Sequence, residues 1–271
     1  MSSPKVPSEL TDNIIDYFCE DMHALAKCST VCKAWLTRSR YHHFRHISLS
    51  YTLRHRTNSF IALCDSSLST ITPYIRSVCL VESKAPADRW IYDTAARLTM
   101  FGDVESLTLK DAIFPLLEIV AGTTLFSKFP KLKRLHLFGA YFRSFSQLVD
   151  IVGACPHLEH IELDGMNYWN RVEIPIDQQP PRRLEKLELG LCDKVAVIDW
   201  LIADQAVLRL TTLCATCLAL GEISSIGALL RTLAPSLEHL ELGSDINYSC
   251  DPSDYRGTQK KAPQNTSLTV G

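Results

Sequence analysis

An apolar triplet with the spacing L-x-x-L-x-L recurs eight times along the 271 residues, and this periodicity limits the possible folds more than any other feature. The central residue of the triplet falls at positions 47, 78, 107, 135, 161, 187, 213 and 240, so successive copies are 31, 29, 28, 26, 26, 26 and 27 residues apart. Three copies are nearly identical: LEHIEL at 158–163, LEKLEL at 184–189 and LEHLEL at 237–242. Such a period predicts a repeat architecture in which each unit packs on its neighbours.

Each unit has the pattern of a β-strand followed by a helix. In four units a proline stands two residues before the first apolar position, at 73, 130, 156 and 235, where it ends a helix and favours an extended segment. Between the triplets lie amphipathic segments, such as 145–152 and 226–233, with apolar residues at helical spacing. We therefore expect an α/β fold with a parallel sheet.

The strand register predicts which side chains face a partner. If positions one, four and six of each unit point into the core, positions three, five and seven lie on the opposite face of the sheet. On that face the first three rows are small and nearly neutral, the fourth carries a cation and an aromatic ring, and later rows carry a file of glutamates beside histidines and a lysine. We expect a protein partner to contact Arg134, His136, Phe138, His160, Glu162, Lys186, Glu188 and Glu241, the residues that become the client-binding set under the resemblance described below.

The glutamate file has two interpretations. Glu162 and Glu188 fall on adjacent strands about 4.8 Å apart, where like charges repel unless a cation offsets them. A basic peptide segment of a partner could supply that cation. Alternatively, the neighbouring lysine and histidines already neutralise the face.

The first 45 residues follow a different pattern. Leu10, Ile14 and Phe18 recur at helical spacing after Pro7, and two further apolar sets follow, ending near Trp35. Three short helices in about forty residues bury little apolar surface alone, so such a unit depends on a partner or on the next domain.

The residues of this segment resemble the F-box. The resemblance rests on Val6-Pro7-x-Glu9-Leu10-x-x-x-Ile14, on Leu25, and on Val31-Cys32-Lys33-x-Trp35, and it covers about 15% of the chain. The family usually has Leu where this chain has Val6. The resemblance implies docking onto a Skp-type adaptor, and through it onto a cullin, by Val6, Pro7, Leu10, Ile14, Leu25, Val31 and Trp35. Alternatively, these residues form the core of a small helical cap on the following domain.

The repeats resemble the longer leucine-rich repeats, so the whole chain is similar to divergent, fungal-type F-box proteins with C-terminal leucine-rich repeats. The expected organisation is a three-helix F-box over 1–45, a solenoid of about eight irregular repeats with a curved parallel sheet over 46–243, and a disordered polar tail over 244–271. One departure is position nine, usually Asn or Cys. Here it is Ser83, Ala112, Ala140, Met166 and once Cys192, so no side-chain ladder is expected under the turn.

The sequence favours a binding protein over an enzyme. With 28 Lys+Arg and 30 Asp+Glu the formal charge is −2, which argues against nucleic acid or an anionic membrane as a partner. Phosphate-binding glycine loops, nucleophile elbows and paired zinc motifs are missing, so we expect no cofactor and no metal. The single C-x-x-C, Cys214 to Cys217, is interpreted as one strand residue and one residue just beyond the strand.

The expected function is substrate recognition in a Skp-cullin-F-box ubiquitin ligase, without catalysis by this chain. The alternative is a leucine-rich-repeat scaffold that assembles proteins without ubiquitin transfer. A signal sequence and a membrane span are not evident, so we expect a protein of the cytoplasm, the nucleus or both. The sequence does not identify the client.

Overall fold

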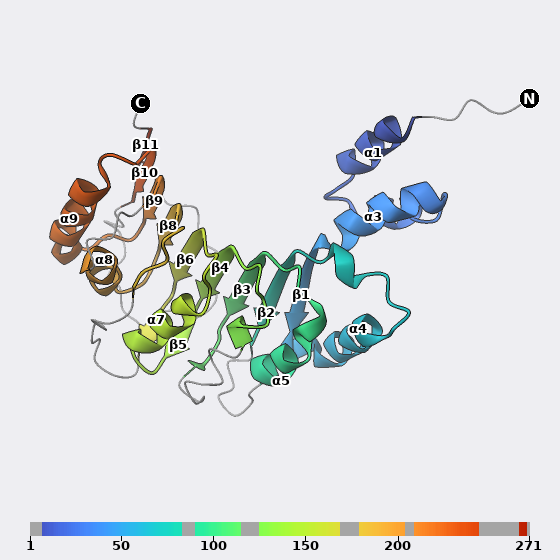
Figure 1. Cartoon of the computed structure of the whole chain (residues 1–271), viewed down its shortest axis with the longest axis horizontal. Helices are drawn as coiled ribbons and strands as arrows, with labels where there is room; N and C mark the ends of the chain where they lie inside the picture. Colours follow the sequence, from blue (N-terminus) through green and yellow to red (C-terminus); the bar gives the residue numbers. More distant parts are fainter. Residues whose placement is uncertain are drawn as a thin grey trace, which may run out of the picture.

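The computed structural model describes residues 7–82, 90–114, 125–168, 179–203, 209–243 and, for the backbone alone, 266–269. These residues form a mixed α/β fold around a nine-stranded sheet whose strands follow one another in chain order (Figure 1). The predicted α/β class with a parallel sheet is confirmed. In order across the sheet, the strands are β1 (His46–Ser50), β2 (Ser77–Val81), β3 (Ser106–Lys110), β4 (Arg134–Phe138), β6 (His160–Asp164), β8 (Lys186–Leu189), β9 (Thr212–Ala215), β10 (His239–Leu242) and β11 (Thr266–Thr269).

The strands pair in the register that the triplets predict. Leu107 aligns with Leu135, Leu135 with Ile161, and Ile161 with Leu187, and every neighbouring pair from β1 to β10 is parallel. Central triplet residues from β2 to β9 are at most 2% exposed. At the two ends, Ile47 of β1 and Leu240 of β10 are only partly buried, because each has fewer neighbouring units.

Five described α-helices that follow β1 in the chain lie along one side of the sheet. Figure 1 shows this arrangement for α4 (Arg54–Asp65), α5 (Trp90–Ala96), α7 (Phe145–Gly153), α8 (Lys194–Ala203) and α9 (Ile223–Leu233). Their apolar side chains, such as Leu148, Trp200 and Leu229, join the inward strand residues in one core. Short 3₁₀ helices occur at Tyr51–Leu53, Thr72–Tyr74, Leu98–Met100 and Leu220–Glu222. No helix among the described residues covers the other face of the sheet (Figure 1).

The turn after several strands repeats the same backbone geometry. Asp111, Gly139, Gly165 and Cys217, each at position eight of its unit, have φ values of 56°, 61°, 63° and 54°. Cys217 thus lies just beyond β9, as predicted. These left-handed residues turn the chain from the sheet towards the helical side.

Position nine forms a ladder of backbone rather than side-chain groups. Ala112 and Ala140 are fully buried, and their carbonyl oxygens accept hydrogen bonds from the N–H groups of Tyr141 (2.8 Å) and Asn167 (2.9 Å) in the next unit. A second, two-stranded sheet continues these contacts, with β5 (Tyr141–Phe142) parallel to β7 (Asn167–Tyr168). Small apolar residues therefore suffice at this position.

Three helices precede the sheet: α1 (Ser8–Tyr17), α2 (Met22–Cys28) and α3 (Lys33–Arg45), which continues directly into β1. Ile15, Leu25 and Cys28 form the buried interior of this segment. In Figure 1 these helices stand apart from the helices that line the sheet.

An ion pair joins α1 to α3. Arg38 donates two hydrogen bonds of 2.6 Å to the carboxylate of Asp16, and His42 Nε2 lies 2.6 Å from Oδ1 of the same carboxylate. The hydrogen bond from Arg38, helped by His42, outweighs burial and lowers the pKa of Asp16 to about 2. The contact fixes the crossing of the two helices.

The end of the chain differs from the expected disordered tail at one place. Residues 266–269 form β11, which pairs antiparallel with the outer edge of β10. The rest of the predicted tail after Gly243 lies outside the described residues. Within the part of the chain that the structure describes, no helix is long and apolar enough to cross a membrane.

Candidate functional site

The helix-free face of the sheet carries the predicted client-binding residues. Alternation along each strand buries positions four and six and leaves positions three and five partly exposed, as in β4, β6 and β8. This placement of side chains on the two faces agrees with the predicted register. Whether the face binds a client stays a prediction.

Two histidine–glutamate contacts cross the centre of this face. His136 Nδ1 lies 2.6 Å from Glu162 Oε2, and His160 Nε2 lies 2.9 Å from Glu188 Oε1. Lys186 Nζ lies 2.8 Å from the same Glu188 oxygen. The two histidine rings pack edge to face with their centroids 4.9 Å apart, so these polar side chains of β4, β6 and β8 form one connected network.

The protonation of this network follows from burial and neighbouring charges. Burial and the nearby His136 lower the pKa of His160, so its imidazole is neutral at neutral pH and can donate its Nε2–H to Glu188. Burial alone would raise the pKa of Glu188, but the hydrogen bond and charge of Lys186 together with His160 outweigh it and lower that pKa. The hydrogen bond to Glu188 raises the pKa of Lys186.

Side chains of this chain therefore contact two members of the glutamate file. Glu162 contacts a histidine, and Glu188 contacts a histidine and a lysine. Of the two sequence interpretations, this geometry supports internal neutralisation for Glu188, which contacts Lys186, whereas Glu162 has a histidine contact alone. A basic client segment is not required to offset Glu188.

At the edge of the network, Phe138 offers an apolar surface. Its ring is partly exposed, and Lys110 of the neighbouring strand places Nζ 5.6 Å from the ring centroid. Arg134, on the same strand, is exposed. Glu241 lies two strands beyond Glu188 and is outside the network of histidine contacts.

The predicted adaptor-binding residues divide into an exposed and a buried group. Leu10, Ile14 and Val31 are 54%, 45% and 61% exposed, Pro7 is exposed and Trp35 is partly exposed. Leu25 is fully buried and belongs to the interior of the three helices. Val6 lies outside the described residues.

Two exposed apolar side chains next to this group were not predicted. Tyr17, 84% exposed, follows Leu10 by seven residues and Ile14 by three, on the same face of α1, and Met22 is 48% exposed at the start of α2. The helical spacing of Leu10, Ile14 and Tyr17 in the sequence could have predicted that Tyr17 shares this face.

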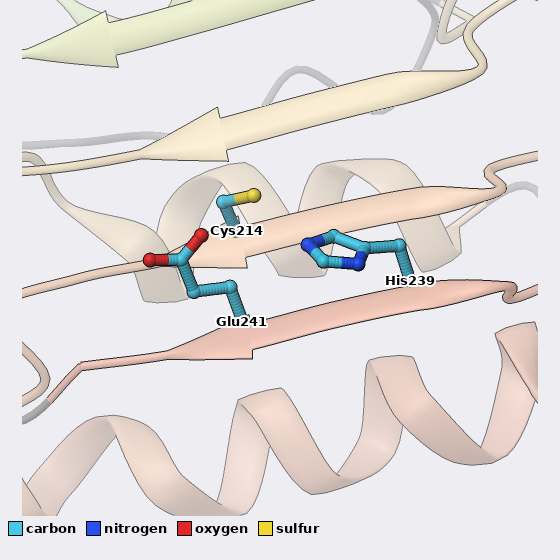
Figure 2. Close-up of side chains that lie close together, drawn as sticks. All are labelled: Cys214, His239 and Glu241. Carbon is cyan, nitrogen blue, oxygen red and sulfur yellow. The ribbon is translucent and has the colours of Figure 1, made fainter. Parts of the chain in front are cut away.

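A third group of side chains meets on β9 and β10. Cys214 lies directly opposite Glu241 in the strand register, and His239 is two residues before Glu241 on the same face (Figure 2). The thiol sulfur, an imidazole nitrogen and a carboxylate oxygen all lie within 4.8 Å of one another. Burial, followed by the charges of Glu188 and Glu241, raises the pKa of the Cys214 thiol to about 11.

The sequence contained the signal for this group. Cys214 is at position five of one unit, and His239 and Glu241 are at positions three and five of the next unit. These positions lie on the same face of two adjacent strands. Metal-ligand motifs such as Cys214 and Cys217 are recognised because their residues are close together along the chain. A set of ligands contributed by two different strands is not recognised in that way.

Comparison with known proteins gives no family. No family model matches the chain, and no curated protein matches it. Among solved structures, the Chaetomium Mex67:Mtr2 subunits align with a TM-score of 0.25 and 14% sequence identity, covering 62% of this chain and 88% of that chain. A TM-score this low does not indicate a shared fold.

Proposed function

We propose that this chain is the substrate-recognition subunit of a Skp-cullin-F-box ubiquitin ligase. In this proposal, α1–α3 are an F-box that docks a Skp-type adaptor, and the strand–helix units are leucine-rich repeats that bind a client protein. The observation that carries the proposal is the exposure of Leu10, Ile14 and Val31, at positions where the F-box resemblance implies contact with the adaptor.

The exposed side chains are not needed for the interior of the helical segment. Ile15, Leu25 and Cys28 already fill that interior, and the Asp16–Arg38 pair holds α1 against α3. If these helices served only as a cap on the sheet, their apolar side chains would be expected to pack against it. Clustered apolar side chains in water favour association, because each Å² removed from water contributes about 25 cal/mol.

The face of the sheet suits protein binding better than catalysis. No helix in the described part of the chain covers it (Figure 1), whereas enzymes exclude water from enclosed pockets. Glu162 and Glu188 are already held by contacts within the chain, so the proposed client would be recognised chiefly by shape and by apolar contact with Phe138 beside Arg134. Adaptor docking implies a place in the cytoplasm or nucleus, where these ligases work.

The test is adaptor binding by the full chain. A purified Skp-type adaptor should bind the wild type, and Leu10→Asp combined with Val31→Asp should remove binding, because two charges would be placed in an apolar interface. Leu220→Asp is the matched control, since Leu220 is 89% exposed on the 3₁₀ segment before α9. Both variants should keep the wild-type circular dichroism spectrum.

The same experiment separates the proposal from a scaffold. Failure of the wild type to bind the adaptor, or equal binding by the double variant, would contradict the F-box function. The chain would then be better described as a leucine-rich-repeat scaffold that assembles proteins without ubiquitin transfer.

A further inference from the structure

We propose that Cys214, His239 and Glu241 form a zinc-binding site on the open face of the sheet, with water completing the coordination. The site is independent of the proposed ligase function. It depends only on the pairing of β9 with β10.

The backbone brings the three ligands together. Parallel pairing sets Cys214 beside Glu241, and the two-residue period of a strand puts His239 on the same face as Glu241. Figure 2 shows the three side chains converging above the two strands. Each ligand therefore comes from a regular strand, which holds it more rigidly than a loop would.

The distances suit a tetrahedral ion. Zinc bonds of about 2.0–2.3 Å to nitrogen, oxygen and sulfur place neighbouring ligand atoms roughly 3.5 Å apart. The three ligand atoms already lie within 4.8 Å of one another. Closing the difference requires about 1 Å of movement per pair, which rotation about side-chain torsions can provide without moving the strands.

The ligand chemistry selects zinc among common divalent ions. One thiolate, one imidazole and one carboxylate form a typical zinc set, while magnesium and calcium prefer oxygen ligands alone. Three protein ligands leave one position open on a face that no described helix covers. That position is accessible to water or to a side chain of a bound protein.

The surrounding charge also favours a cation. Glu188 lies opposite Cys214 on the other neighbouring strand, so carboxylates flank the sulfur on both sides. Zinc binding would convert the thiol to a thiolate, with one proton released to solvent for each Zn–S bond that forms. The two positive charges of the ion would then offset the new thiolate and the carboxylate of Glu241.

The experiment is a calorimetric titration of the reduced, metal-free full chain with zinc chloride. We expect one zinc ion per chain and about one proton released, measured by repeating the titration in buffers of different ionisation enthalpy. Cobalt chloride in place of zinc should give a sulfur-to-cobalt charge-transfer band. Magnesium chloride in excess should not compete.

Three single variants, Cys214→Ser, His239→Gln and Glu241→Gln, should each weaken zinc binding at least tenfold, because even loss of an outer-sphere partner costs about 10–100-fold. The matched control is Cys79→Ser, a partly buried cysteine at the same level of β2, whose strand neighbours are Ser48 and Thr108. It should bind zinc like the wild type.

The variants distinguish this site from a metal bound elsewhere on the chain. No zinc binding by the wild type, or equal affinity in the wild type and the three variants, would overturn the proposal. Loss of the cobalt band in Cys79→Ser but not in Cys214→Ser would overturn it as well, because the metal would then lie at β2. If one variant fails to fold by circular dichroism, the other two still decide.

Discussion

Nδ1 of His136 on β4 lies 2.6 Å from Oε2 of Glu162 on the adjacent β6. A second contact lies one strand further, where His160 is directly opposite Lys186 and reaches Glu188 diagonally, whereas His136 is directly opposite Glu162. In each case a histidine reaches forward by one unit to a glutamate at the fifth position of the next. The repeat thus places a histidine within hydrogen-bond distance of a glutamate of the next unit, so Glu162 and Glu188 both have a contact within the chain.

Ile161→Ala should lower the free energy of unfolding by about 2–5 kcal/mol, because Ile161 is 2% exposed in the core and its truncation leaves a cavity. Glu162→Ala, at the next residue, should cost less than about 1 kcal/mol, as expected for a partly exposed ion pair. Denaturant unfolding measures both. The reverse order would mean that the strand register is shifted by one residue.

Gly190→Ala should destabilise the turn after β8. A Cβ atom at this glycine would lie 2.3 Å from Oδ1 and 3.1 Å from Cβ of Asp164, so the carboxylate would have to move. Oδ1 accepts a 2.8 Å hydrogen bond from the N–H of Leu191, which would be lost, at a cost of about 1–3 kcal/mol. Thermal melts of Gly153→Ala, where a Cβ meets nothing within 4 Å, give the control and should show no decrease.

Glu222→Gln should be more harmful than Lys194→Met. Lys194 is 1% exposed, with Nζ 3.5 Å from Glu222 and 3.2 Å from the carbonyl oxygen of Cys217. Removing the carboxylate charge leaves a buried ammonium without its counter-ion, which costs about 3–5 kcal/mol, whereas a methionine fills the same space without charge. Equal stability of the two variants in urea would contradict a requirement for this pair.

Acid should weaken the contact between α1 and α3. The pKa of Asp16 is about 2 in the folded chain and close to 3.8 when unfolded, so the contact's stabilisation is present above about pH 4 and is lost as the pH falls towards 2. Asp16→Asn should abolish this dependence, measured by hydrogen exchange of the α1 amides. Asp12→Asn, one turn earlier, should retain it, because Arg38 donates its hydrogen bonds to Asp16.

The apolar triplets predicted the sheet well because they report burial directly. The alternation at Leu135, Leu137, Ile161 and Leu163 requires one buried face, and the constant interval requires a constant strand order. Both follow from local pattern, without knowledge of distant contacts.

The contacts of the open face were predictable only in part. The sequence placed His136 and Glu162 on neighbouring strands, but their pairing depends on side-chain rotamers, and so does the position of Lys110 over Phe138. The strand at 266–269 was missed because its short polar sequence has no alternating pattern. Its pairing is provided by the free edge of β10.

The chain-order sheet also has a consequence for folding kinetics. From β1 to β10, each strand hydrogen-bonds only to the strands immediately before and after it in the sheet order, and their central residues are about 26–31 residues apart. Only short loops close at each step, so the entropic barrier stays small and growth can begin at any adjacent pair. Ile161 and Leu187, near the centre of the most regular units, are suited to such a nucleus, with later units adding outward in both directions.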